Sequence, residues 1–402
     1  MIKANGFSLL ETVIAMGIMM VVTAAMFTVM SPSQGRFSVE LEEADVQQRL
    51  RVAQDTLYKD LIMAGAGAYL GPQITAGALN YYFAPVLPFR QGAVNDDGAA
   101  TFHTDRITLF YVPPTTAQTT TTTTLSRGSG PAMLQVKAAT NCPKNVNLCG
   151  FTAGMTVLIF DDRGNYDTFY ITAVNDSSAE ITVNRPPDST TTTYPANSKV
   201  VQAVHRVYYL KSTPSTNSYQ LMRYDGSTNA DVPVVDHVVG LKFDYYGDPR
   251  PPRLRKPLAD PTGPWTTYGP KPPALGSRIP GHGYPAGENC VFQVDAAGDL
   301  QLPRLTLLGS GSNPNSLVLL TASQLTDGPW CPDEASTNRW DADLLRLRKI
   351  GVTLRVEAAV DALRGPAGVL FTRAGSSTGA TRRVPDQEIR FTVSPRNLNL
   401  GR

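Results

Sequence analysis

The fold of this chain is decided by residues 7–30, FSLLETVIAMGIMMVVTAAMFTVM, an apolar run that contains one charged residue, Glu11. A helix of that length would extend about 36 Å, which is enough to cross a hydrocarbon core of about 30 Å. The short flank before the run holds one cation, Lys3. We therefore predict a membrane-spanning helix over residues 7–30.

Two simpler explanations of this run are a secretory signal peptide and a plain membrane anchor. A signal peptide has an apolar region of about 7–15 residues closed by a small-residue cleavage site, whereas this run is longer and no such site closes it. A plain anchor does not account for Glu11, because an unpaired carboxylate at bilayer depth is energetically costly. Glu11 therefore indicates a function for this helix.

A cut between Gly6 and Phe7 would give Glu11 a partner. The new amino group of Phe7 would lie four residues before Glu11 on the same helix face, and the helix dipole favours a negative charge in the first turns. The carboxylate could pair with the amine of its own chain or with that of a neighbouring identical helix. Such a pair, buried among packed apolar helices, would set the axial register of an assembly and would not perform catalysis.

The start of the chain resembles a type IV prepilin. The resemblance rests on Gly6, on the following residues Phe7-Ser8-Leu9-Leu10-Glu11-Thr12 and on the apolar run, which stand at fixed spacing after a short basic flank. It implies that residues 1–6 are a leader and that a prepilin peptidase cuts after Gly6 and N-methylates Phe7. It also implies that Glu11 supports assembly into a helical filament or pseudopilus.

The composition is that of a folded and nearly neutral protein. The 402 residues include 36 Lys and Arg against 34 Asp and Glu, a net charge of +2, so bulk charge gives no reason to expect nucleic acid as a partner. Hydrophobic residues make up 42% of the chain, which is enough for a sizeable core. The 33 glycines and 31 prolines exceed the usual share, and we expect a β-rich, loop-rich body.

A second helical stretch is predicted over residues 31–71, as an amphipathic continuation of the first. Its apolar residues recur at spacings of three and four, which place them on one stripe: Val46, Leu50, Ala53, Leu57, Leu61 and Ala64. Pro32 lies between the two stretches and lacks a backbone donor, so we expect a kink or break there. The glycines from Gly65 to Gly71 are expected to end the helix.

Beyond residue 72 the hydrophobic period changes to two, which predicts antiparallel sheet. Strands are expected near residues 107–111, 157–160, 168–174, 180–183, 352–356 and 389–393, with one long alternating strand over 235–245. Residues 132–184 are expected to form a small β insertion. Residues 249–285, with eleven prolines, are expected to form an extended surface loop. That loop is either an irregular insertion or a contact surface for a partner, a glycan or an anionic surface.

The predicted fold class is therefore α+β, with a long N-terminal pilin helix packed on a large antiparallel β-rich head over residues 72–402. The head carries a second, more diffuse resemblance, to the PilW-like minor pilins, spread over residues 200–397. The matching pieces are Tyr208-Tyr209-Leu210, Leu221-Met222-Arg223, the run 234–246 and the ending Phe391-Thr392-Val393-Ser394-Pro395-Arg396-Asn397.

These resemblances imply a minor pilin of the type IV pilus system. Such a protein would join the major pilin and other minor pilins, on an inner-membrane assembly platform, in a complex that primes or tips the filament. The alternatives are the pseudopilin J of type II secretion, whose heads are usually shorter, and an adhesin or glycan-binding module displayed by a pilin helix. The chain would lie in a bacterial inner membrane before assembly and in a pilus at the cell surface afterwards.

The cysteines fit this location. With Lys3 on the cytoplasmic side of the membrane, the head faces an oxidising periplasm. Four cysteines allow three pairings, and the simplest one, between neighbours in the sequence, joins Cys142 to Cys149 and Cys290 to Cys331.

Patterns that would indicate catalysis, a cofactor or a metal are weak. Residues 375–379, GSSTG, match the string of a nucleophile elbow, but no histidine follows them, and the four histidines of the chain are isolated. The residues Asp161, Asp162, Asn165 and Asp167 could offer oxygens to Ca²⁺, but a hairpin turn requires the same residue types. We therefore expect no catalytic residue, no cofactor and no metal, and we do not expect an enzyme.

Overall fold

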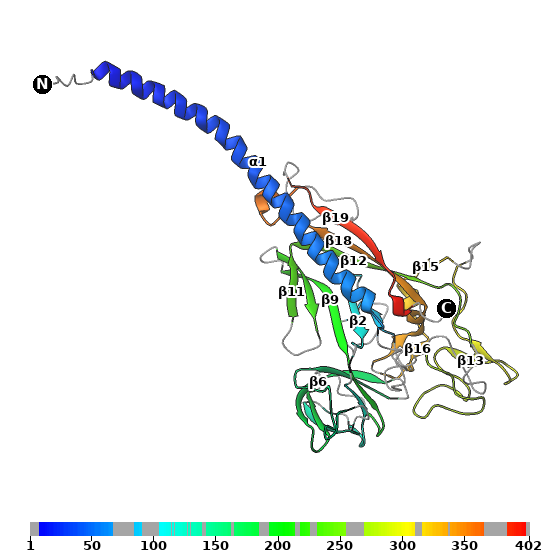
Figure 1. The fold of residues 1–402 in the computed structure, drawn as a ribbon. Helices are drawn as coiled ribbons and strands as arrows, with labels where there is room; N and C mark the ends of the chain where they lie inside the picture. The colour runs from blue at the N-terminus through cyan, green and yellow to red at the C-terminus, as the bar shows by residue number, and fades with distance from the viewer. Residues whose placement is uncertain are drawn as a thin grey trace.

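The computed structural model describes a long helix and a β-rich head (Figure 1). The described residues are 8–66, 84–90, 104–113, 115, 117–126, 128, 130–138, 142–161, 165–184, 193–213, 218–225, 231–254, 269–309, 316–336, 338–365 and 384–398.

The first element is a single α-helix of 55 residues, α1 (Leu9–Met63). Of the kink or break predicted at Pro32, the break is wrong, because the helix continues through this residue and bends gently along its length (Figure 1). A proline removes one N–H from the helix, and a helix with several turns on each side can continue past one missing bond. The helix ends eight residues before the predicted boundary at residue 71. Ala64 leaves the helical conformation, with ψ 128°, and Gly65 has a φ of +73°.

Two antiparallel sheets form the main part of the head. The first has the strand order β1 (Val86–Pro88), β2 (Arg106–Tyr111), β9 (Val204–Thr213), β10 (Ser218–Tyr224) and β11 (Asp231–Asp236). The second has the order β15 (Val318–Leu319), β12 (Val238–Gly247), β18 (Leu347–Val356) and β19 (Gln387–Val393). These bounds confirm the expected strands near 107–111, 352–356 and 389–393.

The predicted strand over residues 235–245 is in fact two strands, and the prediction of one continuous strand is wrong. His237 lies between β11 and β12 with a φ of +59°, a left-handed conformation that histidine adopts more readily than most residues. Because β11 belongs to the first sheet and β12 to the second, His237 is the corner at which the chain changes sheet. Because apolar residues alternate with other residues on both sides of His237, the sequence pattern predicted one continuous strand.

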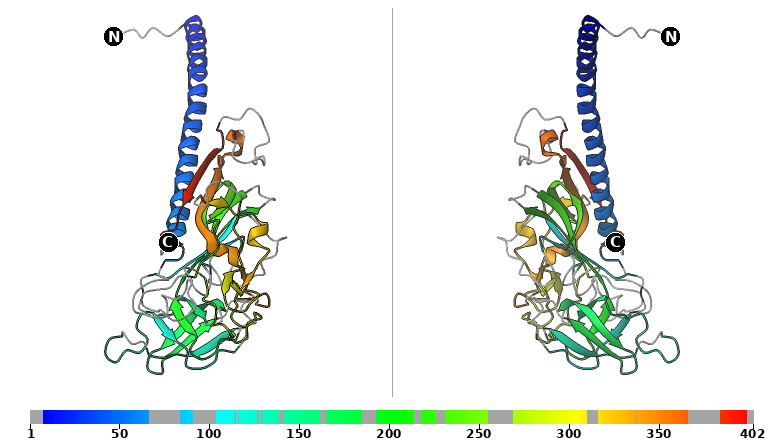
Figure 2. Two further views of the ribbon diagram at one scale, coloured as in Figure 1. Left: turned by 90° about the vertical axis from the view of Figure 1, so that its right-hand side faces the viewer. Right: turned by 90° about the vertical axis from the view of Figure 1, so that its left-hand side faces the viewer.

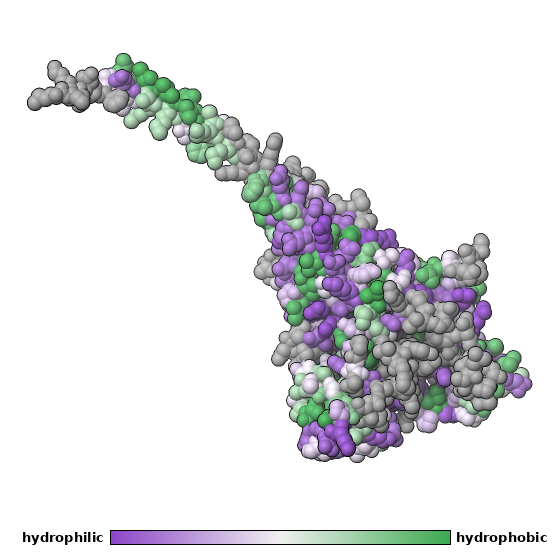
Figure 3. Space-filling model, viewed as in Figure 1, coloured by the Kyte–Doolittle hydropathy of each residue, from purple (hydrophilic) through white to green (hydrophobic). Residues whose placement is uncertain are grey.

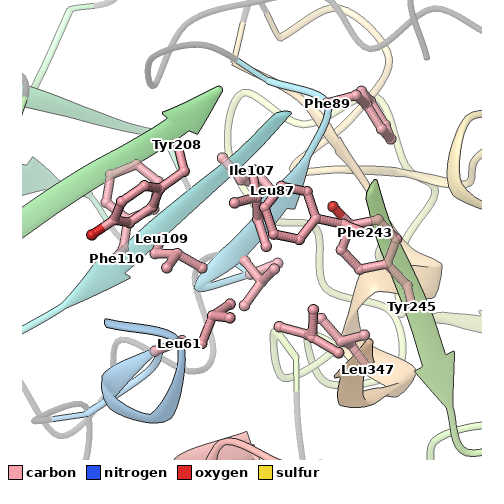
Figure 4. Packing of buried hydrophobic residues seen from close by; sticks show 14 of the residues in the cluster. Leu61, Leu87, Phe89, Ile107, Leu109, Phe110, Tyr208, Phe243, Tyr245 and Leu347 are labelled. Atoms are coloured by element: carbon pink, nitrogen blue, oxygen red, sulfur yellow. The ribbon is translucent and has the colours of Figure 1, made fainter. Parts of the chain in front are cut away.

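The second half of α1 and both sheets share one hydrophobic core. The predicted stripe of the helix is confirmed, since Val46, Ala53, Leu57, Leu61 and Ala64 are all fully buried. Figure 4 shows Leu61 entering the cluster beside Leu109 of the first sheet and near Phe243 and Leu347 of the second. The helix therefore holds the two sheets together by covering both.

A further, six-stranded sheet is inserted in the chain between β2 and β9, which are neighbours in the first sheet. Its strand order is β3 (Gln118–Thr120), β8 (Lys199–Gln202), β5 (Thr156–Phe160), β6 (Tyr166–Asn175), β7 (Glu180–Asn184) and β4 (Pro131–Gln135). The outer strands β3 and β4 are joined through a bridge between Thr121 and Val136, with Thr122 N donating to Gln135 O at 2.8 Å. The sheet thus curls into a small barrel.

This barrel is larger than the predicted insertion over residues 132–184, because β3 and β8 lie outside that range. Both strands are short, with the sequences QTT and KVVQ, and are too brief to show a clear hydrophobic period. The barrel has a core of its own, which includes Val157, Ile159, Phe169 and Ile171.

The opposite faces of the barrel strands pack against the main core. Leu158, Phe160, Tyr166 and Val201 are all buried there. Arg90 Nη1 donates to Tyr166 Oη at 3.3 Å, and Asn338 Nδ2 donates to the carbonyl of Tyr166. The barrel lies at the end of the molecule opposite the free end of α1 (Figure 2).

The remaining elements are short. Two hairpins pair β13 (Phe292–Val294) with β14 (Gln301–Pro303) and β16 (Trp330–Cys331) with β17 (Trp340–Asp341). The 3-10 helices are η3 (Ser323–Leu325), η4 (Ala342–Arg346), η5 (Asp361–Leu363) and η6 (Arg396–Leu398). In the predicted Pro-rich loop, the described residues 249–254 and 269–285 contain neither helix nor strand, as expected.

Candidate functional site

The most unusual surface of the molecule is the first half of α1. Residues Leu9–Thr28 are long enough and apolar enough to span a membrane, and none of their length is buried against the head. The large apolar side chains along this segment are between 47% and 83% exposed, and Figure 3 shows them as an extended hydrophobic surface that leads away from the head. Such a surface is stable in lipid or against other apolar helices, and it is unfavourable in water.

Glu11 is part of the structure that begins this helix. Ser8 is the N-cap, and its Oγ accepts a hydrogen bond from Glu11 N at 3.3 Å. In return, Glu11 Oε2 accepts one from Ser8 N at 3.1 Å. This reciprocal arrangement is a capping box, which satisfies two backbone donors that the first turn would otherwise leave unpaired.

The capping box gives Glu11 a local role that the sequence analysis did not foresee, although Ser8 and Glu11 have the spacing of such a box. The role is compatible with the predicted one, because a carboxylate has two oxygens and can accept further hydrogen bonds or pair with a cation. The proposed cleavage point between Gly6 and Phe7 lies outside the described residues.

The other polar side chains of the segment bond within the helix. Thr12, Thr23 and Thr28 each donate from Oγ1 to a main-chain carbonyl of the preceding turn, at 3.3, 2.6 and 2.8 Å. A hydroxyl bonded in this way adds no unsatisfied group to an apolar surrounding. Glu11 is then the one charged group that this segment carries into any apolar environment.

Both predicted disulfides are present. Cys142 bonds to Cys149 and Cys290 to Cys331, with Cα atoms 5.3 Å apart in each case. The first bond closes a loop on the barrel, where Asp176 Oδ1 accepts hydrogen bonds from Asn147 N at 3.0 Å and Leu148 N at 2.7 Å.

The second disulfide lies in the main core and joins the segment just before β13 to β16. Cys290 and Cys331 are each 1% exposed. A bond in this position crosslinks segments that otherwise have only short strands to hold them.

One cluster of ionisable groups was not anticipated from the sequence. The carboxylates of Asp327, Asp341 and Asp343 lie within 4.8 Å of one another. Asp341 Oδ1 accepts from Asp343 N at 2.8 Å and Oδ2 from Gly328 N at 2.7 Å, and Asp343 Oδ1 pairs with Arg346 Nε at 2.5 Å. Burial raises the pKa of Asp341 to about 8 and that of Asp343 to about 6. These contacts cap η4 and anchor Arg346, so we assign the cluster a structural role.

His205 also has a structural position. His205 is 1% exposed and stacks on Phe110, with the ring centroids 4.7 Å apart. Among the described residues, no group forms a hydrogen bond to either of its ring nitrogens. Burial, assisted by Arg206, lowers the pKa of His205 to about 3, so its ring is neutral at physiological pH. The string at residues 375–379 and the residue Asp162 lie outside the described residues.

Comparison with known proteins adds no identification. No family model matches this chain, and no curated protein matches its sequence.

Proposed function

We propose that this protein is a minor pilin of the type IV pilus system, which enters a filament or its priming complex through the first half of α1. The observation that carries the proposal is the apolar segment Leu9–Thr28, none of which is buried against the head, continuous with a helix half whose apolar stripe is buried in the head. One half of this helix packs on the head, and the other half requires lipid or neighbouring helices around it. The prepilin-like residues before it, Gly6 to Thr12, support the same conclusion.

In this proposal the segment passes from lipid to a bundle of pilin helices without changing its chemistry. Apolar surface is accommodated in both, so the transfer requires no refolding. A prepilin peptidase would cut between Gly6 and Phe7, and Glu11 would neutralise the new amine inside the bundle. A charge that finds no partner in such a medium is costly, which is why the pair would favour one axial register.

The remaining parts of the molecule have separate tasks in this proposal. The head, with its two disulfides, lies in the periplasm before assembly and at the cell surface afterwards. The partners are the major pilin, other minor pilins and the inner-membrane assembly platform.

The experiment compares two variants of Glu11, each as the only copy in the cell. Glu11→Ala removes both the charge and the capping acceptor, whereas Glu11→Gln keeps an oxygen that can accept from Ser8 N and removes only the charge. We expect both variants to insert in the membrane and to be cut after Gly6. We expect both to be depleted at least tenfold from sheared pili relative to the parent chain, because the amine is left unpaired in each.

Two readouts separate the possible results. N-terminal mass spectrometry of the membrane fraction should find N-methyl-Phe7 as the first residue in the parent and in both variants. An intact Met1, or a cut near residue 30, would contradict the pilin assignment. Normal incorporation of Glu11→Gln would show that the cap suffices and that the charge does not set register.

A second candidate function is a displayed binding module. It is favoured by the position of the barrel, which is inserted as a unit with its own core and lies at the end of the molecule farthest from the free end of α1 (Figure 2). Its test is binding of the disulfide-intact protein to a glycan array and to cell surfaces. Binding that is lost when the exposed barrel loops are substituted, with assembly unaffected, would support display over priming.

A further inference from the structure

The second half of α1 is joined to the head by two carboxylates as well as by its apolar stripe. The first is Glu42, which is 9% exposed. Its Oε1 accepts hydrogen bonds from the backbone N–H groups of Ala359 and Val360, the latter at 3.4 Å. Both donors follow the end of β18, so this contact connects the helix to the second sheet.

The second carboxylate is Asp60, near the end of the helix. Its Oδ2 accepts from Tyr208 Oη at 2.5 Å, and its Oδ1 lies 3.5 Å from Tyr111 Oη. Arg206 Nε is 3.9 Å from Oδ2. Tyr111 belongs to β2, and Arg206 and Tyr208 belong to β9, so this contact connects the helix to the first sheet.

The spacing of Glu42 and Asp60 along α1 places them on the same side of the helix. Glu42 and Asp60 are 18 residues apart, which at 3.6 residues per turn is five full turns. They therefore stand on the same side of α1, about 27 Å apart along its axis. Each is bonded to a different sheet, and together they restrain the rotation of the helix and its sliding at both ends.

The apolar stripe restrains that register only through the sizes of its side chains. A slip of one turn along the axis would move Leu61 to the place of Leu57, an even exchange, and Leu57 to the place of Ala53, which overfills a buried site. The same slip would remove Glu42 from Ala359 N and Asp60 from Tyr208 Oη. It would leave these part-buried donors and carboxylates without their partners, which adds a polar penalty to the overfilled apolar site.

We propose that Glu42 and Asp60 are positioning residues, which fix the axial and rotational register of α1 against the head and thereby the direction in which the head projects from packed pilin helices. The inference rests on the proposed function only for its second part. The fixed register is a property of the single chain and can be tested without a filament.

The test uses the full chain extracted in detergent and carrying two spin labels. All four native cysteines are in disulfides, so Gln48→Cys on the helix and Ser177→Cys on the barrel, both at exposed positions, provide the two reactive thiols. Pulsed electron resonance then gives the distribution of distances between the labels. The variant is Glu42→Ala with Asp60→Ala, and the matched control is Glu40→Ala with Asp55→Ala, which removes the same two residue types from exposed positions of the same helix.

A third protein tests the chemistry of the contacts. Glu42→Gln with Asp60→Asn keeps an oxygen at each position that can accept the same N–H and O–H groups. We expect one narrow distance for the parent, for the matched control and for this conservative variant. We expect the double alanine variant to show a broadened distribution, or a second maximum displaced by up to about 5 Å, the rise of one helical turn.

Incorporation into sheared pili is measured in parallel, and the double alanine variant should fall at least fivefold below its matched control. An unchanged narrow distance in the double alanine variant overturns the proposal, whatever its incorporation. So does equal broadening in the matched control. If the double variant is degraded, each single alanine variant is labelled and judged by the same criterion. Absence of the parent chain from every filament contradicts the proposed function and leaves the register result standing.

Discussion

The two halves of α1 differ in composition and in surroundings. In the first half the large apolar side chains are exposed and Glu11 is the one charged residue, whereas in the second half an apolar stripe is buried in the head and charged residues lie on the other faces. The polar groups follow the same division. In the first half they bond to their own helix, while in the second Glu42 and Asp60 bond to the head. A continuous helix can therefore have different roles along its length.

The largest expected effect concerns the head alone. Replacing both Cys290 and Cys331 with serine opens a link across 41 residues and should lower the free energy of unfolding by about 4 kcal/mol. The pair Cys142 and Cys149, only 7 residues apart, should cost about 2.5 kcal/mol. Urea unfolding of the detergent-extracted chain measures both, and membrane insertion should be unchanged in each. A larger loss for the shorter link would contradict the loop-length argument.

The second prediction concerns a leucine-to-alanine substitution made in each half of α1. Leu57→Ala removes a fully buried side chain and should cost about 3 kcal/mol of head stability. Leu10→Ala removes a side chain that is 70% exposed in the single chain and should leave head stability unchanged. Thermal unfolding in detergent measures the pair. Equal losses would show that the first half also packs on the head.

A third prediction concerns the pH dependence of stability that arises from His205, the buried histidine of β9. Because the pKa of His205 falls from 6.5 to about 3 on folding, the unfolded chain binds its proton first as the pH is lowered. This residue therefore reduces stability as the pH falls below about 6.5, by about 2 kcal/mol at pH 5. His205→Phe should remove that slope and should also stabilise the head at pH 7, since it removes two unpaired buried nitrogens.

The measurement for His205 is a comparison of urea unfolding at pH 5 and pH 7. The contribution of Asp341 to the pH dependence of stability has the opposite sign. Because folding raises its pKa from 3.8 to about 8, this residue reduces stability as the pH rises toward 8. The difference between the parent chain and His205→Phe cancels that contribution. A difference that does not change between the two pH values would contradict the assignment of a buried neutral imidazole.

The smallest effect concerns the start of the helix. Ser8→Ala removes the N-cap oxygen that Glu11 N donates to, and should destabilise the first turn by about 1 kcal/mol while leaving head stability unchanged. Hydrogen exchange of the first-turn amides in detergent is the measurement, with Ser8→Thr as the control that keeps a hydroxyl. Unchanged exchange in Ser8→Ala would show that Glu11 alone holds the turn.

The sequence by itself determined the features that depend on local chemistry. The apolar run, its single carboxylate and the stripe of the second half follow from residue type and from the helical period, and the structure has the helix that they predict. The strands near 107–111, 352–356 and 389–393 follow from a period of two. The four cysteines left three pairings open, and the structure has the simplest of them, between neighbours in the sequence.

The contacts between these elements could be seen only in the tertiary structure. Pro32 does not break α1, His237 divides an apparently continuous strand, and β3 and β8 join the barrel from outside the predicted insertion. Glu42 and Asp60 are ordinary charged residues of an amphipathic helix until the head places Ala359 and Tyr208 beside them. The reason is that a periodic pattern records which face of an element is buried, whereas the partner of a polar group on that face is set by residues that are distant in the sequence.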